Sequence, residues 1–233
     1  MKQIAFITVA MLITTGCASS VMPGARFMTG VSANGNFMLP VQSMEERRFA
    51  TVIRQRYDFS CGSAALATLL QYHYGKNVGE SSVFLGMWKD GDRDAIRRVG
   101  FSLLDMKRYL KAQKIEADGY KVSLDQLAQA AIPGIALISI RNYKHFVVIK
   151  GVTAKEVLVG DPSIGLNPVP RAEFEAAWNG IYFVLNSEQE LGRTAFNVPG
   201  QWAAYSRAPV QGRFHEPASI QALALTAPFY RDF

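Results

Sequence analysis

Residues 55–70 read Gln-Arg-Tyr-Asp-Phe-Ser-Cys-Gly-Ser-Ala-Ala-Leu-Ala-Thr-Leu-Leu. An apolar run follows Cys61 and ends at Gly75, so the pattern predicts a helix over residues 61–74. Apolar positions and one histidine recur at helical spacing, which predicts one buried face made of Leu66, Leu69, Leu70 and His73. The stretch therefore puts a cysteine in the first turn of a core helix.

That position gives Cys61 the means to act as a nucleophile. A cysteine attacks as its thiolate, and the free N–H groups and positive dipole end of a helix favour an anion there. A histidine alongside would form a thiolate–imidazolium pair. We expect Asp58 or Ser60 to cap the helix. Gly62 is expected to keep the neighbourhood open, so that a substrate carbonyl can approach the sulfur.

The chain has three histidines, and their positions select one of them as the partner of Cys61. His73 is twelve residues along the same helix, roughly 18 Å away at 1.5 Å per residue, and is better explained as a core histidine. His215 lies in a Pro-rich segment and is most simply a surface residue. His145 opens an apolar strand, where a side chain can project into a cleft. By elimination and placement, His145 is the predicted general base.

Two further residues complete the predicted site. Asp161 follows a short strand, and two adjacent antiparallel strands would bring it beside His145 to fix the imidazole tautomer. Acyl transfer builds negative charge on the carbonyl oxygen, and the Gln55 side-chain amide could hold it together with the Cys61 N–H group. Neither residue is diagnostic alone, because Gly-Asp-Pro is also an ordinary turn signal. They indicate a catalytic site only in combination with Cys61 and His145.

The order of elements predicts an α+β fold, since helices come first and strands afterwards. We expect an extended lead-in over 48–56, then helices at 92–99, 102–113, 125–131 and 171–178, and strands at 134–140, 145–149, 155–159 and 181–185. The nucleophile helix then belongs to an N-terminal helical half packed on an antiparallel β-sheet.

Residues 1–17 predict an export signal. A lysine precedes an apolar run over 4–13 that is too short to remain as a membrane-spanning helix. Small residues precede Cys17, as in bacterial lipoprotein signals, but Thr14 stands where such signals prefer an aliphatic residue. Lipidation of Cys17 and ordinary cleavage near Ala18 both stay open. We expect a periplasmic protein whose only membrane attachment is a lipid at Cys17, if one is added.

The remaining organisation follows from composition. We divide the chain into a signal (1–17), a flexible arm (18–45), a catalytic domain (46–186) and a Pro-rich C-terminal tail (187–233). The net charge is +6, but no block of five basic residues occurs, so nucleic-acid binding is not indicated. Two cysteines and three dispersed histidines form no metal-ligand cluster, and no phosphate-binding loop is present, so we expect no cofactor and no metal.

With these residues in place, the chain resembles the C39 family, the papain-like double-glycine peptidases. The resemblance covers about residues 46–186 and rests on Gln55, Asp58-Phe-Ser-Cys61-Gly-Ser-Ala, His145-Phe-Val-Val and Asp161-Pro. It implies a papain-like cysteine peptidase fold, with Cys61 as nucleophile, His145 as base, Asp161 as its orienter and Gln55 in the oxyanion hole.

Many C39 domains are fused to transporters and trim leader peptides after Gly-Gly, whereas this chain carries an export signal and neither a transmembrane block nor an ATPase. It resembles the stand-alone peptidase type of functional-amyloid (Fap) secretion systems. The resemblance implies a protein or peptide substrate in the cell envelope and secretion-system components as partners. Because the chain differs in this way from the transporter-fused domains, the resemblance does not imply strict Gly-Gly specificity.

Two alternatives to a peptidase remain open. The same residues suit an amidase or transpeptidase acting on cell-wall peptide, which product identity would separate from hydrolysis. A catalytically silent C39-like adaptor that binds a Gly-rich segment is the third hypothesis, although such relatives commonly lose the cysteine or the histidine.

Overall fold

The computed structural model describes residues 42–140 and 143–203. Within them the chain forms helices and strands in the following order: α1 (Met44–Phe49), α2 (Cys61–Tyr74), α3 (Glu80–Asp90), α4 (Arg93–Val99), α5 (Leu103–Ala112), β1 (Ala117–Lys121), α6 (Leu124–Ala130), β2 (Gly134–Ile140), β3 (Tyr143–Val152), β4 (Glu156–Asp161), β5 (Gly165–Pro170), α7 (Arg171–Ala177), β6 (Trp178–Leu185), α8 (Gln189–Thr194) and α9 (Pro199–Ala203). The predicted α+β class is confirmed.

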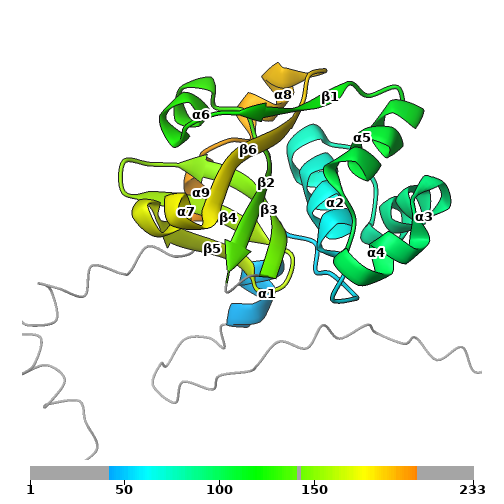
Figure 1. The fold of residues 1–233 in the computed structure, drawn as a ribbon. Helices are drawn as coiled ribbons and strands as arrows, with labels where there is room; N and C mark the ends of the chain where they lie inside the picture. The colour runs from blue at the N-terminus through cyan, green and yellow to red at the C-terminus, as the bar shows by residue number, and fades with distance from the viewer. Residues whose placement is uncertain (1–41, 141–142, 204–233) are drawn as a thin grey trace, which may run out of the picture. The chain divides into compact units, whose positions relative to one another are not determined.

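The strands form one antiparallel sheet in the order β1-β6-β2-β3-β4-β5. Helices α2 to α5 gather on one side of it, and α7 lies on the other (Figure 1). Alternate residues of β3 divide between two cores, as the period of a strand requires. Phe146 and Val148 pack with α2, whereas Val147 and Ile149 pack with Phe174 of α7. The sheet is therefore covered on both faces.

Helix α2 begins and ends where the sequence predicts. Gly75 adopts the left-handed conformation that ends a helix without the steric cost of a side chain (φ 60°). The expectation of a single buried face was too narrow, because twelve of the fourteen residues are buried. The sheet covers one side of α2, and α3 and α5 cover the others. A helix enclosed in this way holds its first turn rigidly.

The segment before α2 differs from the sequence-based prediction. Residues 48–56 were expected to be extended, but α1 runs through Phe49. Its start carries a capping box, in which the Ser43 hydroxyl accepts from the Glu46 N–H and the Glu46 carboxylate accepts from the Ser43 N–H. The Ser-x-x-Glu spacing was a readable signal for this helix.

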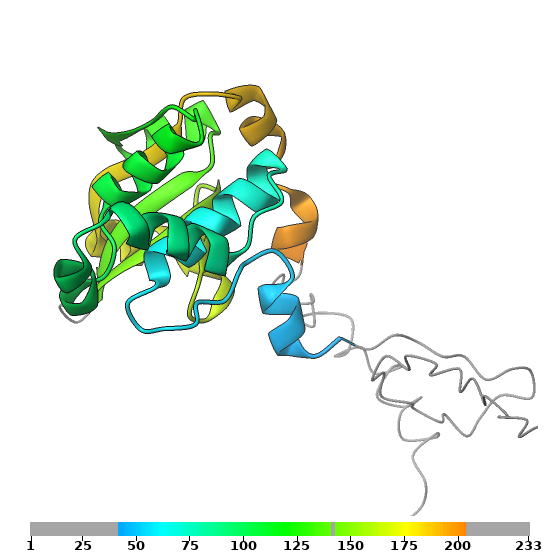
Figure 2. The ribbon, with the colours of Figure 1, turned by 90° about the vertical axis from the view of Figure 1, so that its right-hand side faces the viewer.

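The first part of the predicted tail, up to residue 203, forms α8 and α9. Phe196 is buried in the core, and the Lys76 ammonium pairs with the Glu188 carboxylate at 2.7 Å. Figure 2 shows α8 next to α2, and Gly192 of α8 lies against the Tyr74 ring. This part of the chain packs on the same unit as the sheet.

Several sequence-based expectations concern residues outside the described ranges. They are the signal segment, Cys17, the arm as far as residue 41, the tail beyond residue 203 and His215. In the described part, no helix combines the length and the apolar character needed to cross a membrane.

Candidate active site

Cys61 is the first residue of α2 and is 5% exposed. Ser60 precedes it as the N-cap residue, but its hydroxyl does not cap the helix. It bonds to Tyr57 instead, accepting from the N–H at 3.1 Å and donating to the carbonyl at 3.0 Å. The expected side-chain cap from Ser60 or Asp58 is therefore absent in this part of the chain. The first-turn N–H groups next to the sulfur are left without a capping side chain.

His145 and Asp161 meet across neighbouring strands. His145 lies near the start of β3, and Asp161 is the last residue of β4, which pairs antiparallel to β3. The His145 Nε2 atom is 2.8 Å from Asp161 Oδ1, and both side chains are buried. The structure thus brings together the two residues that the sequence placed on adjacent strands.

The charges around His145 favour its protonated form. Burial lowers the pKa of this imidazole, but hydrogen bonds with Asp161 and with Cys61 outweigh burial and raise it to about 9. Burial has the opposite effect on the Asp161 carboxyl and raises its pKa, but the hydrogen bond to His145 outweighs burial and keeps the pKa below the usual 3.8. A histidine with this pKa is an imidazolium at neutral pH, which is the form that pairs with a thiolate.

The two ring nitrogens of His145 face different partners. Nε2 is taken by Asp161, and Nδ1 is buried without a hydrogen bond of ordinary geometry in the described part of the chain. Cys61 is the second side chain that raises the histidine pKa, so the thiol lies beside this ring. Catalytic hydrogen bonds are often long until a substrate is present. The arrangement can pass a proton between sulfur and imidazole.

Ser163 is a part of the site that the sequence analysis missed. Its N–H and its hydroxyl both donate to Asp161 Oδ1, at 2.7 and 2.6 Å. This is a turn in which an aspartate binds the backbone two residues on. The spacing Asp-Pro-Ser was the available signal. Together with His145, these bonds hold the carboxylate in one orientation.

Gln55 lies in the chain segment that leads to α2. Its backbone N–H donates to the carbonyl of Pro162, the residue after Asp161, at 3.0 Å. Its side-chain Nε2 donates to the Tyr57 carbonyl at 3.1 Å. An amide nitrogen carries two hydrogens, so one donor remains for a ligand. Gln55 is thus tied both to the Asp161 turn and to the turn that precedes Cys61.

Comparison with known proteins decides the family. The sequence profile of the peptidase C39 family matches residues 50–190. The chain belongs to the peptidase C39 family. It is a cysteine peptidase of this type.

Two curated relatives share the name probable functional amyloid protease FapD. The protein from Pseudomonas aeruginosa is 44% identical over 168 residues, which cover 72% of this chain and 74% of the relative. The protein from Pseudomonas fluorescens is 47% identical over 148 residues, which cover 64% of this chain and 66% of the relative. Among solved structures, a double glycine motif protease from an AMS/PCAT transporter in complex with its leader peptide is 29% identical and covers 57% of this chain and 89% of that one, with a TM-score of 0.48.

Gly62 of this C39 chain does not serve the purpose expected from the sequence. A side chain there would not face open space, because a Cβ atom would lie 3.0 Å from Phe101 Cβ and from Met106 Cε. Gly62 faces inward and lets the first turn of α2 approach α5. Room for a substrate therefore has to come from the other side of Cys61.

Tyr143 of β3 is a second residue of the site that the sequence analysis missed. Its hydroxyl donates to the Asp58 carbonyl at 2.8 Å, and its ring lies 6.1 Å from that of His145. The contact ties the start of β3 to the loop before Cys61. A tyrosine in a turn gave no sequence signal for this bridge, because the two residues are far apart in the chain.

The expectation that His73 is a core histidine is confirmed. The residue is 2% exposed, and burial lowers its pKa well below 6.5. The neutral ring is the form that a buried site favours.

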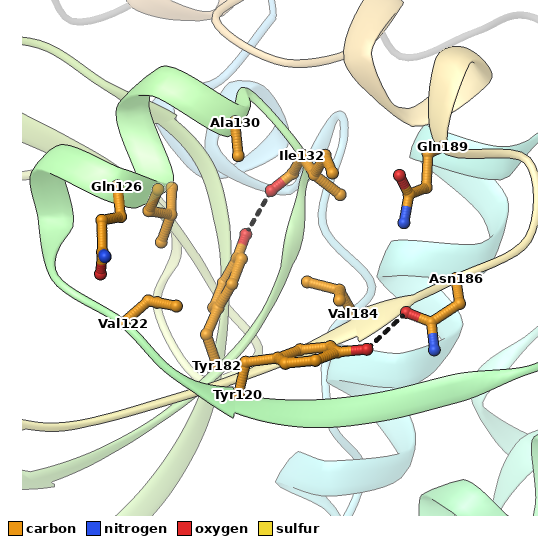
Figure 3. A pocket seen from close by; sticks show the side chains of 10 residues that line it. Tyr120, Val122, Gln126, Ala130, Ile132, Tyr182, Val184, Asn186 and Gln189 are labelled. Atoms are coloured by element: carbon orange, nitrogen blue, oxygen red, sulfur yellow. Dashed lines mark hydrogen bonds between the residues drawn. The ribbon is translucent and has the colours of Figure 1, made fainter.

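One pocket of about 180 Å³ lies away from these residues, between α6, β1, β6 and α8 (Figure 3). Tyr182 donates to the Ile132 carbonyl beside it, and Tyr120 to Asn186. None of the four predicted site residues lines it, so it is separate from the candidate active site. The described residues include no group of three side chains suited to a metal ion.

Proposed function

We propose that Cys61 is the nucleophile of this peptidase and that His145, Asp161 and Gln55 complete its catalytic machinery. The single observation that carries the proposal is the position of His145, whose Nε2 meets Asp161 and whose ring adjoins the thiol at the start of α2. A nucleophile, a base and a group that orients the base are the parts that covalent acyl transfer needs.

The reaction proceeds in two halves. The Cys61 thiolate attacks the scissile carbonyl, and the developing oxyanion is held by the Cys61 N–H and the free hydrogen of Gln55 Nε2. The intermediate collapses to a thioester when the imidazolium of His145 protonates the leaving amine. A water molecule then loses its proton to His145 and attacks the thioester, which releases the acid and restores the thiolate.

The substrate that we propose is an exported protein of a functional-amyloid secretion system. It is supported by the names of the two Pseudomonas relatives and by the export signal expected from residues 1–17. Cleavage after Gly-Gly and contact with secretion-system components belong to the same proposal. Fractionation of cells that express the full chain tests export. Palmitate labelling of the full chain and of Cys17→Ser tests lipidation.

The first experiment is intact-mass analysis of a panel of Gly-Gly peptides incubated with the protein. Wild type is expected to cleave at least one of them, and Cys61→Ala is expected to cleave none while keeping its fold. Two product masses that add up to substrate plus one water indicate hydrolysis, and joined peptides indicate a transferase. Retained activity in Cys61→Ala would disprove the assigned nucleophile. Peptide binding without cleavage by the folded wild type would favour the adaptor alternative.

A further inference from the structure

Lys150 is a buried lysine that the catalytic machinery does not use. Its side chain is 0% exposed, and no ion pair among the described residues includes it. Its Nζ atom donates to the Thr51 carbonyl at 2.9 Å and lies 5.5 Å from the centre of the Tyr72 ring. Burial lowers the pKa of this amine to about 7. Burying an amine costs free energy, and an apolar side chain could fill the same space without that cost. The hydrogen bond to Thr51 is therefore the feature of Lys150 to explain.

The carbonyl that accepts the Lys150 hydrogen bond belongs to Thr51, the first residue of a segment that runs to Gln55 (51–55). Two further hydrogen bonds hold the segment. The Ile53 N–H donates to the Thr68 hydroxyl of α2 at 2.9 Å, and the Gln55 N–H donates to the Pro162 carbonyl at 3.0 Å. The segment is thus fixed to β3, to the nucleophile helix and to the turn after Asp161.

The packing around Lys150 makes room for this contact. Gly160 lies on β4 beside the lysine stem, and a Cβ atom there would be 3.1 Å from Lys150 Cδ and 3.2 Å from Val52 Cγ2. Val52 is itself buried against Leu158 of β4. A residue with a side chain at position 160 would push the lysine and the segment apart. Both lie over the strand that ends in Asp161.

We infer that Lys150 is a positioning residue for Gln55: it fixes the start of the segment 51–55, so that the Gln55 amide stays at the turn that precedes Cys61. Thr68 fixes the same segment from α2. The inference rests on the proposed oxyanion role of Gln55. Lys150 touches no reacting atom, so it acts on the second donor of the oxyanion hole and not on the Cys61–His145 pair.

Lys150→Met tests this in the full chain, because methionine keeps most of the stem and removes the donor. Two rates are measured: cleavage of a Gly-Gly peptide that wild type hydrolyses, and alkylation of Cys61 by iodoacetamide. Alkylation builds no oxyanion, so it reports only the thiolate–imidazolium pair. We expect kcat to fall about tenfold, less than the roughly 10²- to 10³-fold loss when an oxyanion donor is removed. KM and the alkylation rate should change less than about twofold, because the variant loses support for an oxyanion donor and keeps the thiolate–imidazolium pair.

Lys155→Met is the matched control, because Lys155 is an exposed lysine of the β3–β4 turn. It should leave both rates unchanged. If Lys150→Met does not fold, Thr68→Val removes the side-chain hydrogen bond from α2 to the Ile53 N–H and carries the same expectation. An alkylation rate that falls in parallel with kcat would overturn the inference, as would an unchanged kcat.

A double mutant shows whether the effect passes through Gln55. In a Gln55→Ala background, Lys150→Met should cost less than about a further twofold in kcat, since residues that act as a unit are not additive. A second tenfold loss would overturn the inference. If Gln55→Ala itself keeps full activity while Cys61→Ala has none, the oxyanion role and this inference both fail, and the assignment of the nucleophile stands.

Discussion

The charge on His145 sets the pH range in which this site can work. Its pKa is about 9, and the imidazolium is the acid that protonates the leaving amine. We therefore expect kcat/KM to fall as the pH rises through about 9. Asp161→Asn removes the carboxylate that sustains this charge, so the alkaline limb should move to lower pH and kcat should fall. A profile of kcat/KM from pH 5 to pH 10 measures both effects.

The control for this profile is Asp125→Asn, which removes an exposed carboxylate of α6 that pairs with Arg171. It should leave the alkaline limb in place. If Asp161→Asn also leaves it in place, Asp161 does not set the charge of His145, and another group would have to raise the pKa of the ring.

At this scale the sequence identified the residues that belong to a recognisable set. Gln55, Cys61, His145 and Asp161 could be named because acyl transfer needs those residue types and because their order along the chain matches the C39 pattern. Lys150 could not, because a lysine at the end of an apolar strand normally indicates the point where the strand reaches solvent. Strand β3 instead continues to Val152 under α9, and only the three-dimensional packing encloses the lysine.

At the scale of elements, the first turn of α2 depends on close packing at Gly62. Ala at this position gains up to about 1 kcal/mol of helix propensity but places a methyl group 3.0 Å from Phe101 Cβ. Overpacking of this kind typically costs about 1–3 kcal/mol. Gly62→Ala should therefore lower the free energy of unfolding, as measured in denaturant. Gly200→Ala in α9 is the control, because that position is open and should show no loss.

His73 lies at the other end of the same helix and should affect stability only. It is buried with a neutral ring, so His73→Gln should lower the unfolding free energy and leave kcat close to wild type. Activity and denaturant unfolding of the same preparation measure both. Equal loss of activity in folded His73→Gln and folded His145→Gln would undo the assignment of His145 as base.

The elements were predictable where local signals agreed. Helix α2 has a clear stop at Gly75, and the Ser102 and Asp105 capping box marks the start of α5. Strand β1 escaped notice because four of its five residues are not buried, so its alternation is weak. Its pairing with β6 joins residues sixty or more positions apart, and no local pattern encodes such a contact.

At the scale of the whole molecule, two buried bases act on stability in opposite directions. Lys150 has a pKa of about 7 in the folded chain and 10.5 as a free side chain, so the unfolded state binds more protons between these values and stability rises with pH. His145 has a folded pKa of about 9 against 6.5, so its stabilising effect is complete below pH 6.5 and is lost as the pH rises through 9. Between pH 7 and pH 9 the two trends oppose each other in the wild type.

In Lys150→Met, the pH dependence of stability that comes from His145 should become visible. Without the lysine, the free energy of unfolding should fall by about 3 kcal/mol from pH 6.5 to pH 9, since each pKa unit is worth about 1.4 kcal/mol. The wild type should change much less over the same range, and the variant should be more stable than the wild type near pH 6.5, where the buried amine is charged. Urea unfolding at several pH values measures the two curves. Parallel curves would mean that Lys150 does not exchange its proton in this window, and the buried amine would then have to be counted as charged throughout the working range of the enzyme.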